Sequence, residues 1–251
     1  MKALPILCLT AALALAQPPK PTRAAAIQDL VVANHILSNE GVVDAFGHVS
    51  IRDPANPNHY LIARSIAPGS VTIADIVELD LDSKPVAPTA PTLYQERFIH
   101  GEIYKARPDV MSVVHFHAPE VIPFSVTGVP LRAVLHVGGF LGNGPPVFEI
   151  RDAGGVTDML VSNTKLGSAL AKTLGAKPVA LMRGHGAVAV AGGLHAAVGR
   201  AYYTNFNARL LMQALQLGKV TYLDPEEARL AGDQNGFERA WDFWKNRVGG
   251  K

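Results

Sequence analysis

The stretch VVHFHAP, from Val113 to Pro119, places two histidines one residue apart inside an apolar run. Residues i and i+2 of a β-strand point to the same face, so His115 and His117 would present their imidazoles side by side. Such a pair is a natural beginning for a metal site. The chain has nine histidines, however, and a packed histidine is the commoner outcome. The pair alone leaves both interpretations open.

A third histidine favours the metal interpretation. His185 lies between two glycines in MRGHGAVAV (182–190), at a predicted turn where no neighbouring side chain crowds the imidazole. Three neutral imidazoles that leave a coordination position open suit a catalytic divalent metal. Glu96, on the predicted inward face of a helix, adds a carboxylate that could act as ligand or base. The alternative is a surface glutamate paired with Arg97 or Lys105.

Strand-like and helical segments alternate along the chain. Strands are predicted over 47–53, 59–64, 75–82 and 111–117, over 131–142 and 145–150, and in a hairpin over 178–192 that turns at RGHG. Helices are predicted over 25–38, 92–106 and 161–174, along Val198, Tyr202, Phe206 and Leu210, and along Phe237, Trp241 and Trp244. The second of these helices should begin at Thr92 with a start that resembles a capping box. The interleaving favours a layered α/β domain.

Composition fits one compact globular domain. Of the 251 residues, 48% are hydrophobic and 18% are charged. The formal net charge of +2 is evenly spread and argues against a nucleic-acid partner. Cys8 is the only cysteine, which excludes thiolate zinc sites and cysteine nucleophiles in the rest of the chain.

The amino-terminal segment differs in kind from the rest of the chain. Lys2 precedes an apolar run over 3–16 that ends in Ala-Leu-Ala, which predicts a secretory signal peptide over residues 1–16. A lipoprotein cysteine within this segment is the alternative. Residues 17–25 are predicted as a linker and 26–251 as one domain with a C-terminal helical extension. The apolar run is too short to span a bilayer, so we expect a periplasmic or secreted protein without membrane association after cleavage. A misassigned start codon would instead make it cytoplasmic.

The order of these motifs resembles the class II aldolase and adducin family. Glu96, VVHFH and RGHG follow GHVSIR (47–52), and EIYKARPDVMSVVHFHAPEVIPFSVTG (102–128) extends the resemblance, which runs from about Ala26 to Leu223. It implies a three-layer α/β/α sandwich around a largely antiparallel sheet, commonly in a homotetramer with active sites between subunits. It also implies a divalent metal site, usually zinc or manganese, formed by Glu96, His115, His117 and His185.

Departures from the sugar-phosphate aldolases of that family indicate a different substrate. Where those members carry an Asn, a Thr-Gly pair and a Ser-Ser pair around the phosphate, this sequence has His48, Arg64 with Ser65, and Tyr94-Gln95. An arginine binds a carboxylate through two parallel hydrogen bonds. The sequence thus resembles the branch that decarboxylates hydroxylated aromatic or pyridine dicarboxylates.

Decarboxylation and aldol cleavage both leave an electron pair that a metal can stabilise as an enolate. We expect a hydroxyl and a carboxylate of the substrate to chelate the metal, Arg64 to hold a carboxylate, and Ser65 and His48 to contact the substrate. Glu96 is the first candidate for proton transfer. His136 is the second, near where sugar-phosphate members carry a tyrosine acid, with a structural strand histidine as the alternative.

His100, four residues after Glu96, is expected to orient that carboxylate from the next helical turn. The sequence therefore predicts a metal-dependent carbon–carbon lyase, most simply a decarboxylase that acts on a small carboxylate. Two alternatives stay open. One is an aldolase acting on an unphosphorylated hydroxy-keto acid, and the other is an adducin-like binding protein without catalysis.

Overall fold

The computed structural model describes residues 22–88, 91–232 and 235–249. The predicted signal peptide and most of the predicted linker lie outside these residues. Helix α1 (Arg23–Asn39) already begins at residue 23, because the Thr22 side chain caps it by accepting the N–H of Ala25, so the end of the predicted linker is helical. Over the described ranges, no helix is long and apolar enough to cross a membrane.

In the described residues, one seven-stranded sheet organises the fold. Its strand order is β3-β2-β1-β4-β7-β6-β5, and all neighbours are antiparallel except β5 and β6. The strands are β1 (His48–Arg52), β2 (His59–Ala63), β3 (Ile76–Asp80), β4 (Ser112–Phe116), β5 (Val147–Phe148), β6 (Val179–Met182) and β7 (Gly186–Ala191).

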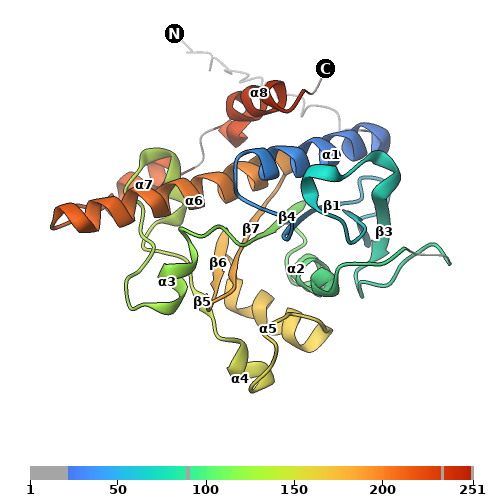
Figure 1. Ribbon diagram of the computed structural model, residues 1–251, viewed down its shortest axis with the longest axis horizontal. Helices are drawn as coiled ribbons and strands as arrows, with labels where there is room; N and C mark the ends of the chain where they lie inside the picture. Colours follow the sequence, from blue (N-terminus) through green and yellow to red (C-terminus); the bar gives the residue numbers. More distant parts are fainter. Residues whose placement is uncertain (1–21, 89–90, 233–234, 250–251) are drawn as a thin grey trace, which may run out of the picture.

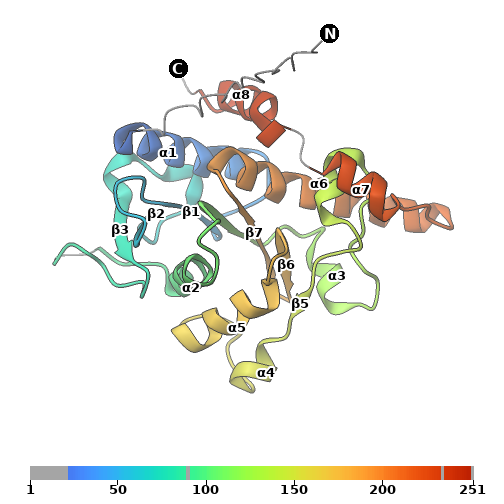
Figure 2. The same cartoon turned by 180° about the vertical axis from the view of Figure 1, so that it is seen from behind.

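Helices cover both faces of this sheet, as Figures 1 and 2 show. Side chains of α1, α6 (Leu194–Leu217) and α8 (Glu238–Arg247) pack on one face, in a cluster that includes Val114. Side chains of α2 (Phe98–Ala106) and α5 (Thr164–Leu174) pack on the other, in a cluster that includes Val113. The predicted α/β/α architecture with a largely antiparallel sheet is confirmed. Because side chains alternate along a strand, His115 lies on the α2 face with Val113.

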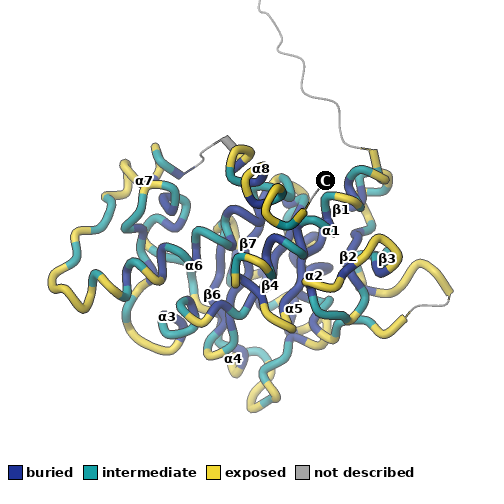
Figure 3. Tube along the Cα trace, turned by 45° about the horizontal axis from the view of Figure 1, so that its top comes forward, coloured by how far each residue is buried: buried dark blue, intermediate teal, exposed yellow. Residues whose placement is uncertain are grey.

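The sheet is buried between the two hydrophobic clusters. Figure 3 shows the central strands as the most buried part of the chain, with exposed residues gathered on loops and outer helix faces. In the C-terminal extension, Trp241 and Trp244 are each 2% exposed, and the Trp244 ring lies 4.7 Å from that of Tyr202 on α6. The predicted aromatic stripe therefore packs on the chain's own core. The shorter elements are α3 (Ile122–Val126), α4 (Ile150–Gly154), α7 (Pro225–Ala231), η1 (Pro68–Ser70), η2 (Ile73–Asp75) and η5 (Asn235–Phe237).

The strand predicted over 131–142 is wrong. This segment is extended and then forms the 3-10 helix η4 (His136–Leu141). Two of its backbone groups bond to a side chain: the Asn207 amide of α6 accepts the N–H of Val134 at 2.9 Å and donates to the carbonyl of Arg132 at 2.9 Å. Of the strand predicted over 145–150, only the two residues of β5 pair with the sheet.

The helix predicted from Thr92 begins later. Gln95–Arg97 form the 3-10 turn η3, and α2 starts at Phe98 without the expected capping box. The carbonyl of Thr92 accepts the N–H of Ser65 at 2.8 Å, which holds the preceding segment outside the helix. Glu96 therefore lies in a turn before the helix, with φ −86° and ψ 16°.

Candidate metal centre

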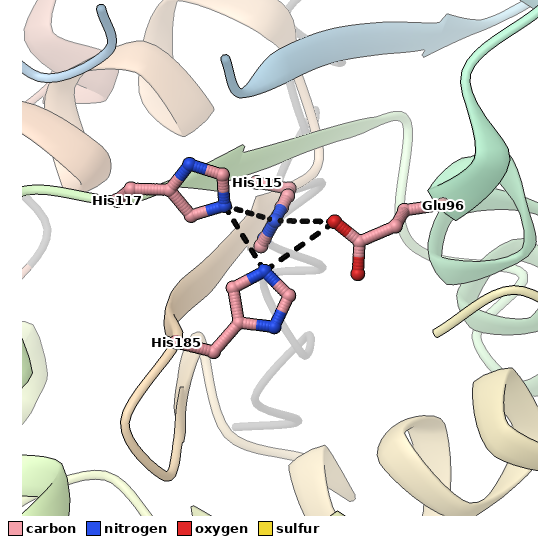
Figure 4. A group of neighbouring side chains, drawn as sticks. All are labelled: Glu96, His115, His117 and His185. Carbon is pink, nitrogen blue, oxygen red and sulfur yellow. Dashed lines mark hydrogen bonds and ion pairs between the residues drawn. The ribbon is translucent and has the colours of Figure 1, made fainter. Parts of the chain in front are cut away.

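Four side chains from the turn before α2, the end of β4 and the turn between β6 and β7 face one another. Glu96 comes from η3, His115 from β4, His117 from the first residue after β4, and His185 from the turn between β6 and β7 (Figure 4). Each offers one ligand atom, and these atoms all lie within 4.8 Å of one another. The sequence predicted this group, and the fold brings it together because β4 and β7 are neighbours.

Two glycines shape the turn that carries His185. Gly184 has φ +62°, a left-handed conformation that favours glycine. At Gly186, an added Cβ would lie 2.2 Å from the carbonyl oxygen of Phe116. The RGHG sequence thus lets β7 approach the end of β4 closely enough for the imidazoles of His185 and His117 to meet.

The ligand atoms are close to one another. His117 Nε2 lies 2.9 Å from His115 Nε2 and 3.1 Å from His185 Nε2. Glu96 Oε2 lies 3.4 Å from the Nε2 atoms of both His115 and His185. Three imidazole nitrogens and one carboxylate oxygen therefore converge on a common point.

Hydrogen bonds behind the rings determine which nitrogens carry protons. His115 Nδ1 lies 3.1 Å from the carbonyl oxygen of Ala187, and His185 Nδ1 lies 3.1 Å from that of Met159. A carbonyl only accepts, so each Nδ1 is protonated, and in the neutral imidazole each Nε2 keeps a lone pair directed to the centre. His117 Nε2 can donate one proton at most, so its two short contacts cannot both be hydrogen bonds.

This donor set fits a divalent cation. Backbone carbonyls that fix the tautomer of a histidine are the usual support of metal-binding imidazoles. Glu96 is also oriented, because its Oε1 accepts the N–H of Val161 at 2.9 Å and leaves Oε2 for the centre. Three imidazoles are a ligand set of catalytic zinc, and the additional carboxylate oxygen also suits manganese.

The charge states agree with this assignment. Burial opposes ionisation of Glu96, but His115 and His185 outweigh it and hold the pKa of that carboxyl far below its usual range. Burial, followed by His115 and His185, lowers the pKa of His117 to about 3. Glu96 is therefore an anion and His117 a neutral imidazole near pH 7, as metal ligation requires.

Glu96 is not a surface ion-pair partner. Its side chain is buried, and the two cations predicted as alternative partners bond elsewhere. Arg97 donates to the backbone carbonyls of Ser83 and Tyr94. Lys105 donates to Asp82 and Glu102. The surface alternative is therefore wrong.

The prediction that His100 orients the Glu96 carboxylate is wrong, because His100 bonds to other residues. His100 Nε2 lies 2.6 Å from His48 Nδ1, and its Nδ1 lies 2.6 Å from Ser50 Oγ. The spacing of four residues does not align His100 with Glu96, because Glu96 precedes the first helical turn. Burial first, then neighbouring imidazoles, lowers the pKa of His100 to about 3 and that of His48 well below its ordinary value.

The remaining predicted residues lie outside the four-residue cluster. Arg64 Nε donates to Asp75 Oδ1 at 2.7 Å, and Ser65 is exposed. His136 is exposed at the start of η4 and is not a strand residue. Within the described ranges, none of the three has a hydrogen bond, ion pair or ring contact with the cluster.

Tyr94 joins the Arg64 loop to the centre, a link that the sequence patterns did not predict. Its hydroxyl donates to the carbonyl of Ile66, and its ring lies 4.6 Å from that of His48. His48 pairs with His115 across β1 and β4, and their ring centroids are 5.0 Å apart. A path of contacts thus leads from the loop to the metal centre.

A cavity of about 790 Å³ lies at the opposite ends of β4 and β7, lined in part by Arg52, Met111, Ala191 and His195. None of the four ligand residues lines it. Arg52 donates to four backbone carbonyls and His195 pairs with Glu238, so these charged groups are already bonded within the chain. The convergent ligand atoms of Glu96, His115, His117 and His185 make that cluster, and not this cavity, the candidate functional centre.

Residues 28–212 match the family model of the Class II Aldolase and Adducin N-terminal domain. The chain belongs to this family. It is 36% identical over 248 residues to Decarboxylase tropJ of Talaromyces stipitatus, covering 88% of this chain and 93% of that protein. It is 32% identical over 217 residues to a 3,4-dihydroxyphthalate decarboxylase of Arthrobacter keyseri, covering 78% and 82%.

Solved structures of the family share the fold. The L-fuculose 1-phosphate aldolase from Glaciozyma antarctica matches with a TM-score of 0.77 at 21% identity, covering 93% of this chain and 96% of that one. An aldolase II superfamily protein from Pseudomonas syringae matches with a TM-score of 0.74 at 21% identity, covering 92% and 94%. Decarboxylases and aldolases are both lyases. This member, with its cluster of three histidines and one glutamate complete, is an enzyme of that class rather than a non-catalytic binding protein.

Proposed function

We propose that the protein is a divalent-metal-dependent decarboxylase that removes carbon dioxide from a hydroxylated aromatic carboxylate or a related dicarboxylate. The observation that carries this proposal is the convergence of three imidazole Nε2 atoms beside an ionised carboxylate, in a chain whose curated relatives include decarboxylases. We also propose zinc or manganese as the cation, and export of the enzyme to the periplasm or medium on the strength of its first 16 residues.

The residues of the centre would have different roles. His115, His117 and His185 would hold the cation, with Glu96 Oε2 beside them. A bound divalent cation supplies Lewis acidity that stabilises the electron pair left when the carbon–carbon bond breaks. Glu96 is held by Val161 through one oxygen, and its other oxygen is available to hold or return a proton at the substrate carbon.

Arg64 would orient the substrate by a carboxylate. Its Nε bonds to Asp75, while its terminal nitrogens have no hydrogen-bond partner among the described residues. A guanidinium fixed at one nitrogen can still pair with a carboxylate through the others. Ser65, the next residue, adds an exposed hydroxyl, and Tyr94 ties this loop to the histidines.

His136 has a role only if a second copy of the chain brings it to the centre. It is exposed and does not contact the cluster of its own chain. We therefore propose a homo-oligomer, a tetramer by resemblance, in which His136 of one copy serves as a proton donor at the centre of another.

The test is metal analysis combined with product analysis. The chain from residue 17 would be purified, its bound metals measured, and the protein incubated with ortho-hydroxy aromatic and pyridine dicarboxylates, among them 3,4-dihydroxyphthalate. We expect about one zinc or manganese per chain and metal-dependent release of carbon dioxide, both lost in His115→Ala. Release of an aldehyde from a hydroxy-keto acid would overturn decarboxylation in favour of aldol cleavage. Full turnover by a metal-free protein would overturn the metal centre.

A further inference from the structure

A chain of buried hydrogen bonds leads away from the metal centre on the α2 face of the sheet. His48 Nδ1 bonds to His100 Nε2 at 2.6 Å, and His100 Nδ1 bonds to Ser50 Oγ at 2.6 Å. Ser50 Oγ bonds in turn to the Tyr104 hydroxyl at 2.7 Å. All four side chains are buried, at 4% exposure or less. Ser50, His100 and Tyr104 are at most 1% exposed, so each of their protons needs an acceptor within the chain.

The far end of this chain determines the direction of every bond. Among the described residues, the Tyr104 hydroxyl has no acceptor other than Ser50 Oγ, because its other polar neighbour is the N–H of Val113, which can only donate. Tyr104 must therefore donate to Ser50. The Ser50 hydroxyl then has its single proton free for His100 Nδ1. His100 must carry its own proton on Nε2 and donate it to His48 Nδ1.

His48 is thereby fixed as a neutral imidazole with its proton on Nε2. This is the opposite tautomer to that of His115 and His185, whose protons lie on Nδ1. The His48 ring lies between His115 and Tyr94, with centroids 5.0 and 4.6 Å away. Its Nε2 has no hydrogen-bond partner among the described residues, so the fold presents an unused N–H donor beside the metal centre.

We propose that His48 donates this Nε2–H to an oxygen of the substrate that carries or develops negative charge, and that Ser50, His100 and Tyr104 are positioning residues that impose its tautomer. The proposal deepens the proposed function and rests on it. A donor held in place before the reaction stabilises developing charge without reorganisation. The His48 N–H would select substrates with an oxyanion or carboxylate beside the metal-chelating group. It would disfavour analogues with an amino group at that position.

The proton positions can be observed directly. A neutron crystal structure of the zinc-loaded protein should show deuterium on Nε2 of His48 and His100 and none on their Nδ1 atoms. It should show the reverse for His115 and His185. A proton on His48 Nδ1 would overturn the proposal. This readout is independent of the substrate, so it can succeed or fail separately from the proposed decarboxylation.

The contribution to catalysis is tested by matched variants. His48→Leu should lower kcat by about 100-fold with zinc content unchanged, as expected for loss of one preorganised donor. His48→Gln, which retains an N–H, should recover part of that loss. Equal activity of the leucine and glutamine variants would overturn the assignment of a donor at this position.

Ser50→Ala tests the positioning chain, with Ser112→Ala as its control. Both serines are fully buried in adjacent strands, but Ser112 Oγ donates to the backbone carbonyl of Ser50 and to none of the four side chains that form the chain of bonds. Ser50→Ala should lower kcat about tenfold with little change in KM, because one positioning hydrogen bond is lost while the reacting groups stay in place. Ser112→Ala should change kcat less than about twofold, since it leaves the positioning bonds intact. Equal losses in the two variants would show a merely structural role. If Ser50→Ala does not fold, the neutron structure and the His48 pair still decide the proposal.

Discussion

Glu96 and Val161 are joined by one hydrogen bond that orients the metal centre. Glu96 Oε1 accepts the backbone N–H of Val161 at 2.9 Å, so Oε2 is directed to the imidazoles of His115 and His185. Val161 is fully buried, which makes this bond part of the core. The carboxylate is thus fixed before any cation or substrate arrives, and its charge and its position can be tested separately.

Glu96→Gln should remove the charge and keep the shape. We expect weaker metal binding, because an anion no longer faces the cation, and a kcat lower by about 100-fold or more at saturating metal, because an amide cannot transfer the proton. Metal titration followed by kcat measurement separates the two effects. Glu102→Gln on α2, whose carboxylate bonds to Lys105, is the matched control and should change neither. Unchanged kcat at metal saturation would limit Glu96 to ligation.

The turn that carries His185 should not accept a side chain. In Gly186→Ala the new Cβ would lie 2.2 Å from the carbonyl of Phe116, so either the β4–β7 pairing or the His185 turn must shift. We expect a loss of about 1–3 kcal/mol in the free energy of unfolding, together with weaker metal binding. Gly128→Ala is the control, because its Cβ would have no atom within 4 Å. Denaturant unfolding of the metal-free proteins would measure the difference.

Metal binding should weaken in acid. In the metal-free protein, burial opposes protonation of His185, but the bond to Glu96 and its charge outweigh burial and raise the pKa of His185 above its ordinary value. A ligating imidazole must be neutral, so protons compete with the cation, and affinity is lost as pH falls through that raised pKa. Calorimetry in buffers of different ionisation enthalpy should detect a proton released per cation bound. Affinity that stays constant from about pH 8 to 5 would contradict this, given the ordinary histidine pKa near 6.5.

Arg64 should contribute to substrate binding and not to metal binding. Arg64→Ala should raise KM about 10- to 100-fold, the range of a hydrogen bond to a charged group, with metal content unchanged. Arg229→Ala, on an exposed arginine paired with Glu226, is the control for loss of one surface cation. Kinetics and elemental analysis on the same preparations test both parts. Equal loss of metal and of substrate binding would mean that Arg64 supports the centre instead.

Local spacing predicted the metal centre well because its ligands are set by short patterns. His115 and His117 are close in sequence, and the glycines that flank His185 define a turn. The strand pattern also places Ser50 on the same face as His48, a signal that the prediction did not include. The pairing of β1 with β4, which places His48 against His115, depends on contacts between distant segments and has no local signal.

The failed predictions have tertiary causes. The sequence predicts a helix from Thr92, but the backbone bond between Ser65 and Thr92 holds that segment outside α2, so Glu96 and His100 do not lie one helical turn apart. The apolar segment near Val134 looks like a strand, yet Asn207, far along the chain, takes its backbone bonds. Local periodicity could not identify Ser65 or Asn207 as the bonding partners of these segments.

His136 can be tested by complementation between inactive variants. If a second copy of the chain supplies His136, then His136→Ala and His115→Ala should each have low turnover for different reasons. His136→Ala should keep its metal, and His115→Ala should lose it. Mixed oligomers, produced by co-expression with two tags, contain centres with an intact cluster from one copy and His136 from the other, so they should be more active than either parent.

The outcomes of the complementation separate three arrangements. Recovery of activity supports both the homo-oligomer and a shared centre. Low activity in both variants without recovery would place His136 in the centre of its own chain, which would require η4 to move from where it lies. Full activity of the His136→Ala variant by itself would show that His136 takes no part in catalysis. Glu96 would then be the proton donor, since its Oε2 is the other candidate and is already directed at the centre.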